Sequence, residues 1–262
     1  MTVPQQGETL QLVQHALTTI VLDAVQYFPA NKKRKQGEAH GLLFGLPMDD
    51  KLECDYVFPV GNVKYRKADE IMNDLDIDLA ITQAKQIFAT SRYLGTYHSH
   101  PNDEPFPKWA TPSIGDVLYA EAIKDPYMII IALTRNAAVP KKLQMQSNLC
   151  DAKSYHYWKG SAPYEHPNTV DLGYEVSYIL GHFLEYEFEM RAYAYRNREL
   201  FDINLTSSEA ELIQLLDKHN VEISKLSVEQ TYRLRKMEYN LRANEDRQQS
   251  NTEYHLKRLL KD

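Results

Sequence analysis

Residues 94–101 read Leu94-Gly95-Thr96-Tyr97-His98-Ser99-His100-Pro101. Few side chains before His98 are polar, which predicts a short strand over residues 93–97 that leads into the histidines. Side chains two apart on a strand point to the same face, so His98 and His100 are expected side by side, with Ser99 turned away. Pro101 has no N–H for a strand ladder, and the strand is expected to end there.

A carboxylate follows in Pro112-Ser113-Ile114-Gly115-Asp116. This stretch predicts the first turn of a helix over residues 113–123. Two imidazoles and one carboxylate are a common catalytic zinc set that leaves a fourth position open for water. We therefore predict that His98, His100 and Asp116 hold one zinc ion, and that the reaction is the metal-assisted hydrolysis of an amide.

Hydrolysis also needs a general base, for which Glu38 is the candidate. Glu38 opens a predicted strand over residues 38–45, whose glycines allow a backbone or ligand to approach closely. A carboxylate can take a proton from the attacking water and pass it to the leaving amine. The hydroxyl of Ser113 is expected to donate a hydrogen bond to the developing oxyanion.

The composition is that of an ordinary globular chain. It has 262 residues, 43% of them hydrophobic and 25% charged, with a net charge of −6. The acidic balance argues against broad binding to nucleic acid or to an anionic membrane. Cys54 and Cys150 are too few for a disulfide framework and are expected to be packed thiols. We see neither a signal peptide nor a membrane-spanning run, so the expected location is the cytoplasm.

Hydrophobic periodicity predicts helices and strands in an alternating order. Helices are expected over residues 10–28, 76–90 and 113–123, the last capped by Thr111 or Ser113. Strands are expected over residues 38–45, 55–60, 93–97 and 127–133, with an edge strand over residues 142–146. This order indicates an α/β chain of the α+β type, with a mixed sheet flanked by helices.

The composition changes near Asp151. Residues 151–173 are rich in glycine, proline and small polar side chains, and are interpreted as a linker or an irregular packing segment. Residues 174–262 are interpreted as an all-helical extension, with helices over residues 174–200, 208–219 and 227–260. Ser208 and Ser227 each open a predicted capping box.

The motifs of the first part resemble those of the JAMM (MPN-plus) zinc isopeptidases. The likeness rests on Glu38 with Gly41-Leu42-Leu43-Phe44-Gly45, on His98-Ser99-His100-Pro101, and on Pro112-Ser113-x-x-Asp116. It covers roughly residues 8–147, so the catalytic domain is expected within residues 1–150. The resemblance implies a cytidine-deaminase-like core with a mixed, curved sheet flanked by helices.

The same resemblance implies roles for these residues. Glu38 would be the general acid and base, His98, His100 and Asp116 the ligands of one zinc ion, and Ser113 the oxyanion donor. Family members cut after the C-terminal glycine of ubiquitin or a ubiquitin-like protein, so deconjugation or precursor maturation is implied.

The expected partners follow from that activity. They are a ubiquitin-like protein, together with conjugation enzymes or a second copy bound through residues 174–262. By this resemblance, prokaryotic relatives occur with ubiquitin-like conjugation genes, including antiviral ones, so a defence role is implied. The lack of eukaryotic-style extra domains favours a bacterial source.

One departure from the family pattern concerns the spacer between His100 and Ser113. Residues 101–112 form a longer spacer than is usual, and Lys108 stands where the shorter spacing would place the serine. We interpret residues 102–110 as holding an insertion at the rim of the site. Within it, Phe106 and Trp109 are candidates to cover the metal or grip a substrate tail. His40 shares the strand face of Glu38 and is expected to be structural or substrate-facing.

Two other function classes remain open from the sequence. The chain could be a catalytically silent scaffold that keeps this fold within a conjugation complex. It could also be a DNA-associated relative, since RadC proteins share the His-x-His…Ser-x-x-Asp arrangement. Taken alone, each site residue also has an ordinary structural explanation, such as a helix cap for Ser113 or a favourable helix N-terminal charge for Asp116.

Overall fold

A computed structural model of the chain describes residues 7–28, 37–61, 65–66, 71–72, 79, 82–83, 91–136, 143–157, 166–221 and 225–242. The strands are β1 (Thr9–Leu12), β2 (His40–Pro47), β3 (Leu52–Pro59), β4 (Tyr65–Arg66), β5 (Ile71–Met72), β6 (Arg92–Pro101), β7 (Tyr127–Arg135), β8 (Gln144–His156), β9 (Asn168–Phe183), β10 (Tyr186–Arg196) and β11 (Glu199–Ser207). The helices are α1 (Ala16–Gln26), α3 (Ile114–Ile123), α4 (Ser208–Lys218) and α5 (Val228–Arg242).

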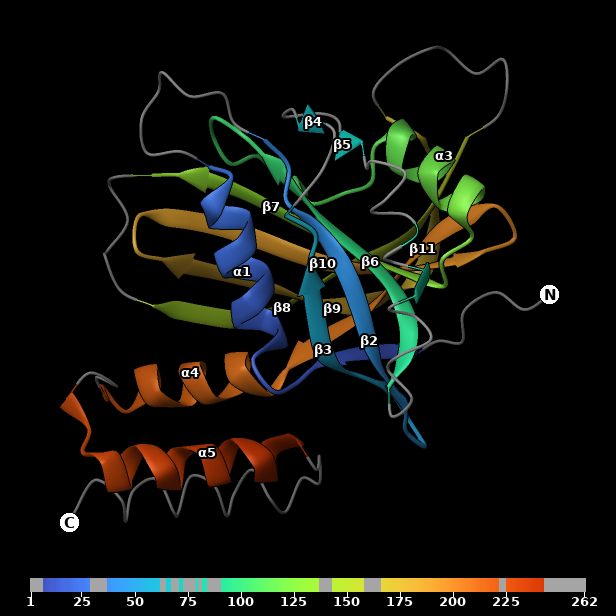
Figure 1. The fold of residues 1–262 in the computed structure, drawn as a ribbon. Helices are drawn as coiled ribbons and strands as arrows, with labels where there is room; N and C mark the ends of the chain where they lie inside the picture. The colour runs from blue at the N-terminus through green and yellow to red at the C-terminus, as the bar shows by residue number, and fades with distance from the viewer. Residues whose placement is uncertain are drawn as a thin grey trace.

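The main sheet closes into a barrel in the order β1-β11-β8-β9-β10-β7-β6-β2-β3 (Figure 1). The strand pairs β6/β7, β1/β11 and β1/β3 are parallel, and the others are antiparallel. Because both kinds of pairing occur in one sheet and helices pack against it, the chain is of the α+β type with a mixed sheet, as the order of elements predicted.

The first helix packs on one face of this sheet. Six apolar side chains of the helix predicted over residues 10–28 are all buried, at Val13, Leu17, Ile20, Val21, Ala24 and Phe28. The helix begins later than predicted, at Ala16, because residues 9–12 form β1 between β11 and β3. Strand pairing satisfies the backbone of these residues, which overrides their helical periodicity. On the same face, the Tyr97 hydroxyl donates to Asp23 Oδ2 of α1 at 2.7 Å.

The helix predicted over residues 174–200 is wrong, because β9, β10 and the start of β11 occupy this stretch. In β10, Phe188, Met190 and Ala192 pack into the core with α1. The alternate positions hold Glu189 and Arg191, which are buried as an ion pair. Buried charges hide the period of two that marks a strand, and the aromatic and apolar residues then fit a helical spacing.

The predicted boundary at residue 150 falls inside β8. This strand lies between β9 and β11 in the barrel, so it is longer and more central than the edge strand predicted over residues 142–146. The predicted linker over residues 151–173 begins and ends in strands, and its middle, residues 158–165, lies outside the described residues. Strands from both sides of the boundary therefore share one sheet, and residues 174–262 are not all-helical.

The predicted helices near the C-terminus are present as α4 and α5, which lie side by side below the barrel (Figure 1). The capping box at Ser227 is confirmed, since its N–H donates to Gln230 Oε1 at 2.8 Å and its Oγ accepts from the Gln230 N–H at 3.2 Å. The box predicted at Ser208 is wrong, because Ser207 is the N-cap and accepts from the Ala210 N–H.

Two predicted helical stretches fall on residues that the structure does not describe. These are the part of the last helix beyond residue 242 and most of the helix over residues 76–90. Within the described residues, no helix has both the length and the apolar character needed to cross a bilayer.

Candidate metal centre

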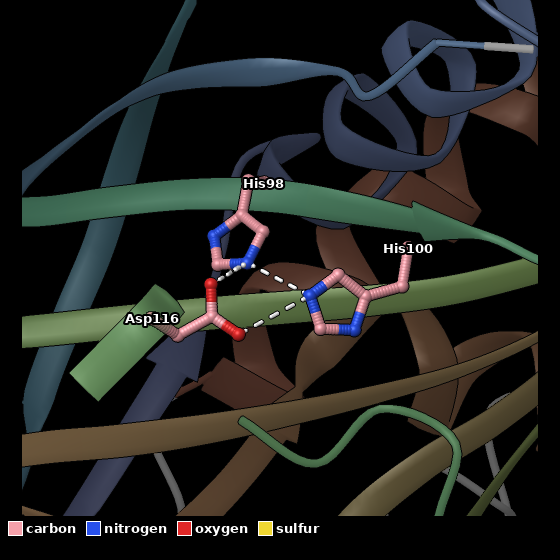
Figure 2. A group of neighbouring side chains, drawn as sticks. All are labelled: His98, His100 and Asp116. Atoms are coloured by element: carbon pink, nitrogen blue, oxygen red, sulfur yellow. Dashed lines mark hydrogen bonds and ion pairs between the residues drawn. The ribbon is translucent and has the colours of Figure 1, made fainter. Parts of the chain in front are cut away.

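Three side chains from β6 and α3 converge on one point (Figure 2). His98 Nε2 lies 2.9 Å from Asp116 Oδ1, and His100 Nε2 lies 3.4 Å from Asp116 Oδ2. The two Nε2 atoms are 3.1 Å apart. The structure therefore brings together the three residues that the sequence predicted as metal ligands.

The ladder between β6 and β7 explains why α3 meets the histidines. His98 is opposite Ile130 and His100 is opposite Ala132, so these four side chains share one face of the sheet. Ile130 and Ala132 form a buried cluster with residues of α3, including Val117. This apolar contact holds α3 over the histidine face and directs its first turn toward the imidazoles.

The cap of α3 then fixes Asp116. Ser113 is the N-cap, and its Oγ accepts from the Asp116 N–H at 3.2 Å. In return, Asp116 Oδ2 accepts from the Ser113 N–H at 2.6 Å and from the Ser113 hydroxyl at 2.8 Å. The cap is therefore Ser113 and not Thr111. Asp116 holds the helix start and faces the histidines with the same carboxylate.

Glu38 is held beside the site by Ser99, which points away from the histidines as predicted. The Ala39 N–H donates to Ser99 Oγ at 2.7 Å, and the Ser99 N–H donates to the Ala39 carbonyl at 3.0 Å. These bonds tie residues 38–40 to β6. His40 is opposite His98 in the β2/β6 ladder, so the two side chains share a face, and both Glu38 and His40 are buried.

The charges of the site are mutually compensating. Burial lowers the pKa of His98, but the Asp116 carboxylate and the nearby Glu38 charge raise it by more, so the net shift is upward. Burial alone would raise the pKa of Asp116, yet His98 and His100 hold that pKa well below its usual range. Glu38 is therefore within electrostatic reach of His98, as a base acting at this site must be.

The residues of the long spacer lie over the sheet. The Asn102 N–H donates to the Leu133 carbonyl at 2.9 Å, and the Thr134 hydroxyl donates to the Asp103 carbonyl at 2.9 Å. Trp109 is buried in the cluster beneath α3, whereas Phe106 is half-exposed with its ring 6.4 Å from that of Trp109. Trp109 is thus a residue of the apolar core. Contact of either ring with a substrate stays a prediction.

The donor set fits a metal ion. Ligand atoms about 2.0–2.1 Å from a tetrahedral zinc ion lie ~3.3 Å from one another. The three separations here are 2.9, 3.1 and 3.4 Å. Each of the three residues offers one ligand atom, these atoms all lie within 4.8 Å of one another, and the group could hold a metal ion.

Sequence reasoning missed some of the residues that build this site. The sequence predicted only that Ser99 points away from the histidines. A serine between two strand histidines can form side-chain hydrogen bonds only on the opposite face of the strand. Sequence reasoning also missed Ile130 and Ala132 as the floor on which α3 rests. No single-sequence signal identifies them, because any apolar strand would show the same letters.

No protein-family model matches the chain, and no curated protein matches it. Among solved structures, the chain is similar to the solution structure of protein DSY2949 from Desulfitobacterium hafniense. That match has 17% identity and a TM-score of 0.40, and it covers 76% of this chain and 92% of that one.

Proposed function

We propose that this protein is a zinc-dependent isopeptidase that cleaves after the C-terminal glycine of a ubiquitin-like protein. The observation that carries the proposal is the convergence of His98, His100 and Asp116 at one place, with the charge of Glu38 close enough to act on His98. A carboxylate base beside a His-His-Asp set is what metal-assisted amide hydrolysis requires. The substrate class and the JAMM-like core come from the motif resemblance.

His98, His100 and Asp116 would hold the zinc ion. When bound, zinc acts as a Lewis acid and makes hydroxide available near neutral pH, because it lowers the pKa of water to about 7. With zinc held there, the charge of the cation itself would keep the Asp116 carboxylate ionised.

Glu38 would move the proton in this reaction. Its carboxylate would accept a proton from the attacking water and then donate it to the nitrogen of the leaving amine. Burial keeps bulk water from competing for that proton, as Glu38 is 9% exposed. The Ser113 hydroxyl donates to Asp116 Oδ2 in the structure, and as the oxyanion donor it would turn this hydrogen toward the carbonyl oxygen that becomes negative.

The test compares the native protein with Glu38→Gln on a ubiquitin-like protein joined to lysine. We expect the native protein to contain zinc and to cleave the conjugate, with loss of activity in chelator and recovery on adding zinc. Glu38→Gln should lower kcat by about a hundredfold to ten-thousandfold, as expected for loss of a general base, while zinc content stays the same.

The matched control is Glu175→Gln, which makes the same change at an exposed carboxylate on β9. It should retain native kcat. Cleavage at native speed by Glu38→Gln, or a purified native protein that binds no zinc, would show that the proposed machinery is wrong.

A further inference from the structure

A pocket of about 460 Å³ lies between the long spacer and three strands of the barrel. The spacer lines it with Phe106 and Trp109, and the strands line it with Gln144, His182, Glu187 and Glu189. It lies apart from the metal ligands, and the proposed mechanism does not use it.

This pocket and the metal centre occupy the same face of the sheet. His100 is opposite Ala132 in the β6/β7 ladder, and Ala132 is opposite Glu189 in the β7/β10 ladder. Side chains at paired positions point to the same face, so Glu189 faces the same side as His100. Adjacent strands are ~4.8 Å apart, which places β10 ~10 Å from β6.

The spacer connects the two places directly. It starts one residue after His100 and ends one residue before Ser113, so both of its ends adjoin the metal centre. Its hydrogen bonds to Leu133 and Thr134 carry it across β7 toward β10. Ala132 and Thr134 beneath the spacer are buried, so a peptide leaving the histidines would pass over the spacer and reach the pocket beside the half-exposed ring of Phe106.

The walls of the pocket combine negative charge with aromatic rings. Glu189 is neutralised by Arg191, whose Nε donates to Glu189 Oε1 at 2.5 Å. Glu187 accepts only from a neutral amide, Asn136 Nδ2 at 3.4 Å, and no cation of the described residues forms an ion pair with it. One carboxylate is thus uncompensated beside the ring of Phe106.

Further polar groups surround this carboxylate. His182 is opposite Glu187 in the β9/β10 ladder, and its Nδ1 is buried without a hydrogen-bond partner within the described structure. Gln144 is in turn opposite His182. The pocket therefore presents an anion, polar side chains and an aromatic wall, a combination that suits a cation carried on an apolar stem.

We propose that this pocket binds a basic side chain of the peptide substrate, with arginine preferred over lysine. Arginine is favoured because its planar guanidinium stacks on aromatic rings and donates several hydrogen bonds in one plane. An extended chain advances ~3.3 Å per residue, so the basic residue would stand about three positions from the cleaved bond. The assignment of the ligand to a substrate rests on the proposed isopeptidase function.

The test measures binding without turnover. The probes are short blocked peptides that differ only in one side chain, arginine, lysine or the neutral isostere citrulline. They are titrated into the full-length protein while the NMR signal of the Trp109 indole N–H is followed. We expect the arginine peptide to bind about fivefold to tenfold more tightly than the citrulline peptide, with lysine between them.

Variants locate the effect in the pocket. Glu187→Gln should remove the preference for arginine over citrulline, and Phe106→Ala, at a half-exposed ring, should weaken arginine binding. Glu175→Gln, an exposed carboxylate of the same sheet, should leave the preference unchanged. Equal binding of arginine and citrulline peptides, or an undiminished preference in Glu187→Gln, would overturn the proposal.

This outcome is separable from that of the proposed function. Selective arginine binding without conjugate cleavage would refute the isopeptidase and leave the basic subsite standing. Cleavage by the native protein without selective binding would refute the subsite alone.

Discussion

Ser99 shows at the scale of a residue how the site is assembled. Its neighbours His98 and His100 face α3, while its own hydroxyl faces the other way and accepts from the Ala39 N–H. The residue is fully buried, so this bond has no competition from water. The same strand thereby supplies two candidate metal ligands on one face and fixes the segment that carries Glu38 through the other.

Asp202 gives a prediction at the same scale. Burial raises the pKa of its carboxyl to about 6, although Arg191 and the Lys153 N–H act in the opposite direction. The folded state therefore binds this proton more tightly than the unfolded state, and the group contributes stability at low pH that is lost as pH rises from about 4 to about 6.

We expect this loss to disappear in Asp202→Asn. The free energy of unfolding of the native protein, relative to that of Asp202→Asn, should fall by about 2–3 kcal/mol between pH 4 and pH 7, since each unit of pKa shift corresponds to about 1.4 kcal/mol. Urea unfolding over this pH range measures it, with Glu175→Gln expected to follow the native curve. Parallel curves for the native protein and Asp202→Asn would contradict the prediction.

At the scale of elements, the junction of β6 with α3 is the unit that makes the site. The strand supplies the period of two that aligns the histidines, and the helix supplies a capped first turn that presents Asp116. The buried apolar cluster that contains Val117 and Ile130 packs the helix onto the sheet. The site therefore depends on the packing of two elements and not on either alone.

Ser113 allows the structural and chemical roles of this junction to be separated. Ser113→Ala removes the cap of α3 and should lower the free energy of unfolding by about 1 kcal/mol. If the hydroxyl also stabilises the oxyanion, kcat for conjugate cleavage should fall by about a hundredfold or more.

Ser207→Ala is the matched control, because it removes the N-cap of α4 away from the metal centre. It should cost similar stability and leave kcat unchanged. Equal loss of kcat in both variants would mean that Ser113 acts on activity only through stability. Urea unfolding and initial rates on the same preparations give both quantities.

At the scale of the whole molecule, the C-terminal strands complete the barrel. β8, β9, β10 and β11 stand between β7 and β1 in the closed order, so the sheet that carries the histidines includes residues far along the chain. α4 and α5 pack together through their own small apolar cluster of Leu215, Leu216, Leu234 and Met237.

Truncations should show that the barrel needs β9, β10 and β11 to fold, whereas it does not need α5. A chain ending at residue 173 lacks most of β9 and all of β10 and β11, and should fail to fold, since β7 loses β10 and β8 loses β11 and most of β9. A chain ending at residue 221 keeps the barrel and α4, and should retain zinc and a cooperative thermal transition at a lower Tm. Circular dichroism and zinc analysis of both chains provide the measurement, and a folded, zinc-containing chain of residues 1–173 would contradict it.

Local sequence was sufficient where a single element decides the outcome. The spacing of His98 and His100, the start of α3 at Ser113 and Asp116, and the apolar stripe of α1 follow from strand and helix periods, which depend only on near neighbours. The fold of residues 174–207 did not follow, because Glu189 and Arg191 lie buried where a sequence pattern expects exposed side chains.

The contacts that bring distant elements together were decided by tertiary structure. The approach of Asp116 to the histidines depends on Ile130 and Ala132, which come from a strand after α3 in the chain. The pocket beside Glu187 depends on β8, β9 and β10, which come later in the chain than β7. The spacing of apolar residues determines which side of a helix or strand faces the core. Which elements pack together is determined only when the barrel closes, because it depends on the apolar surface buried over the whole sheet.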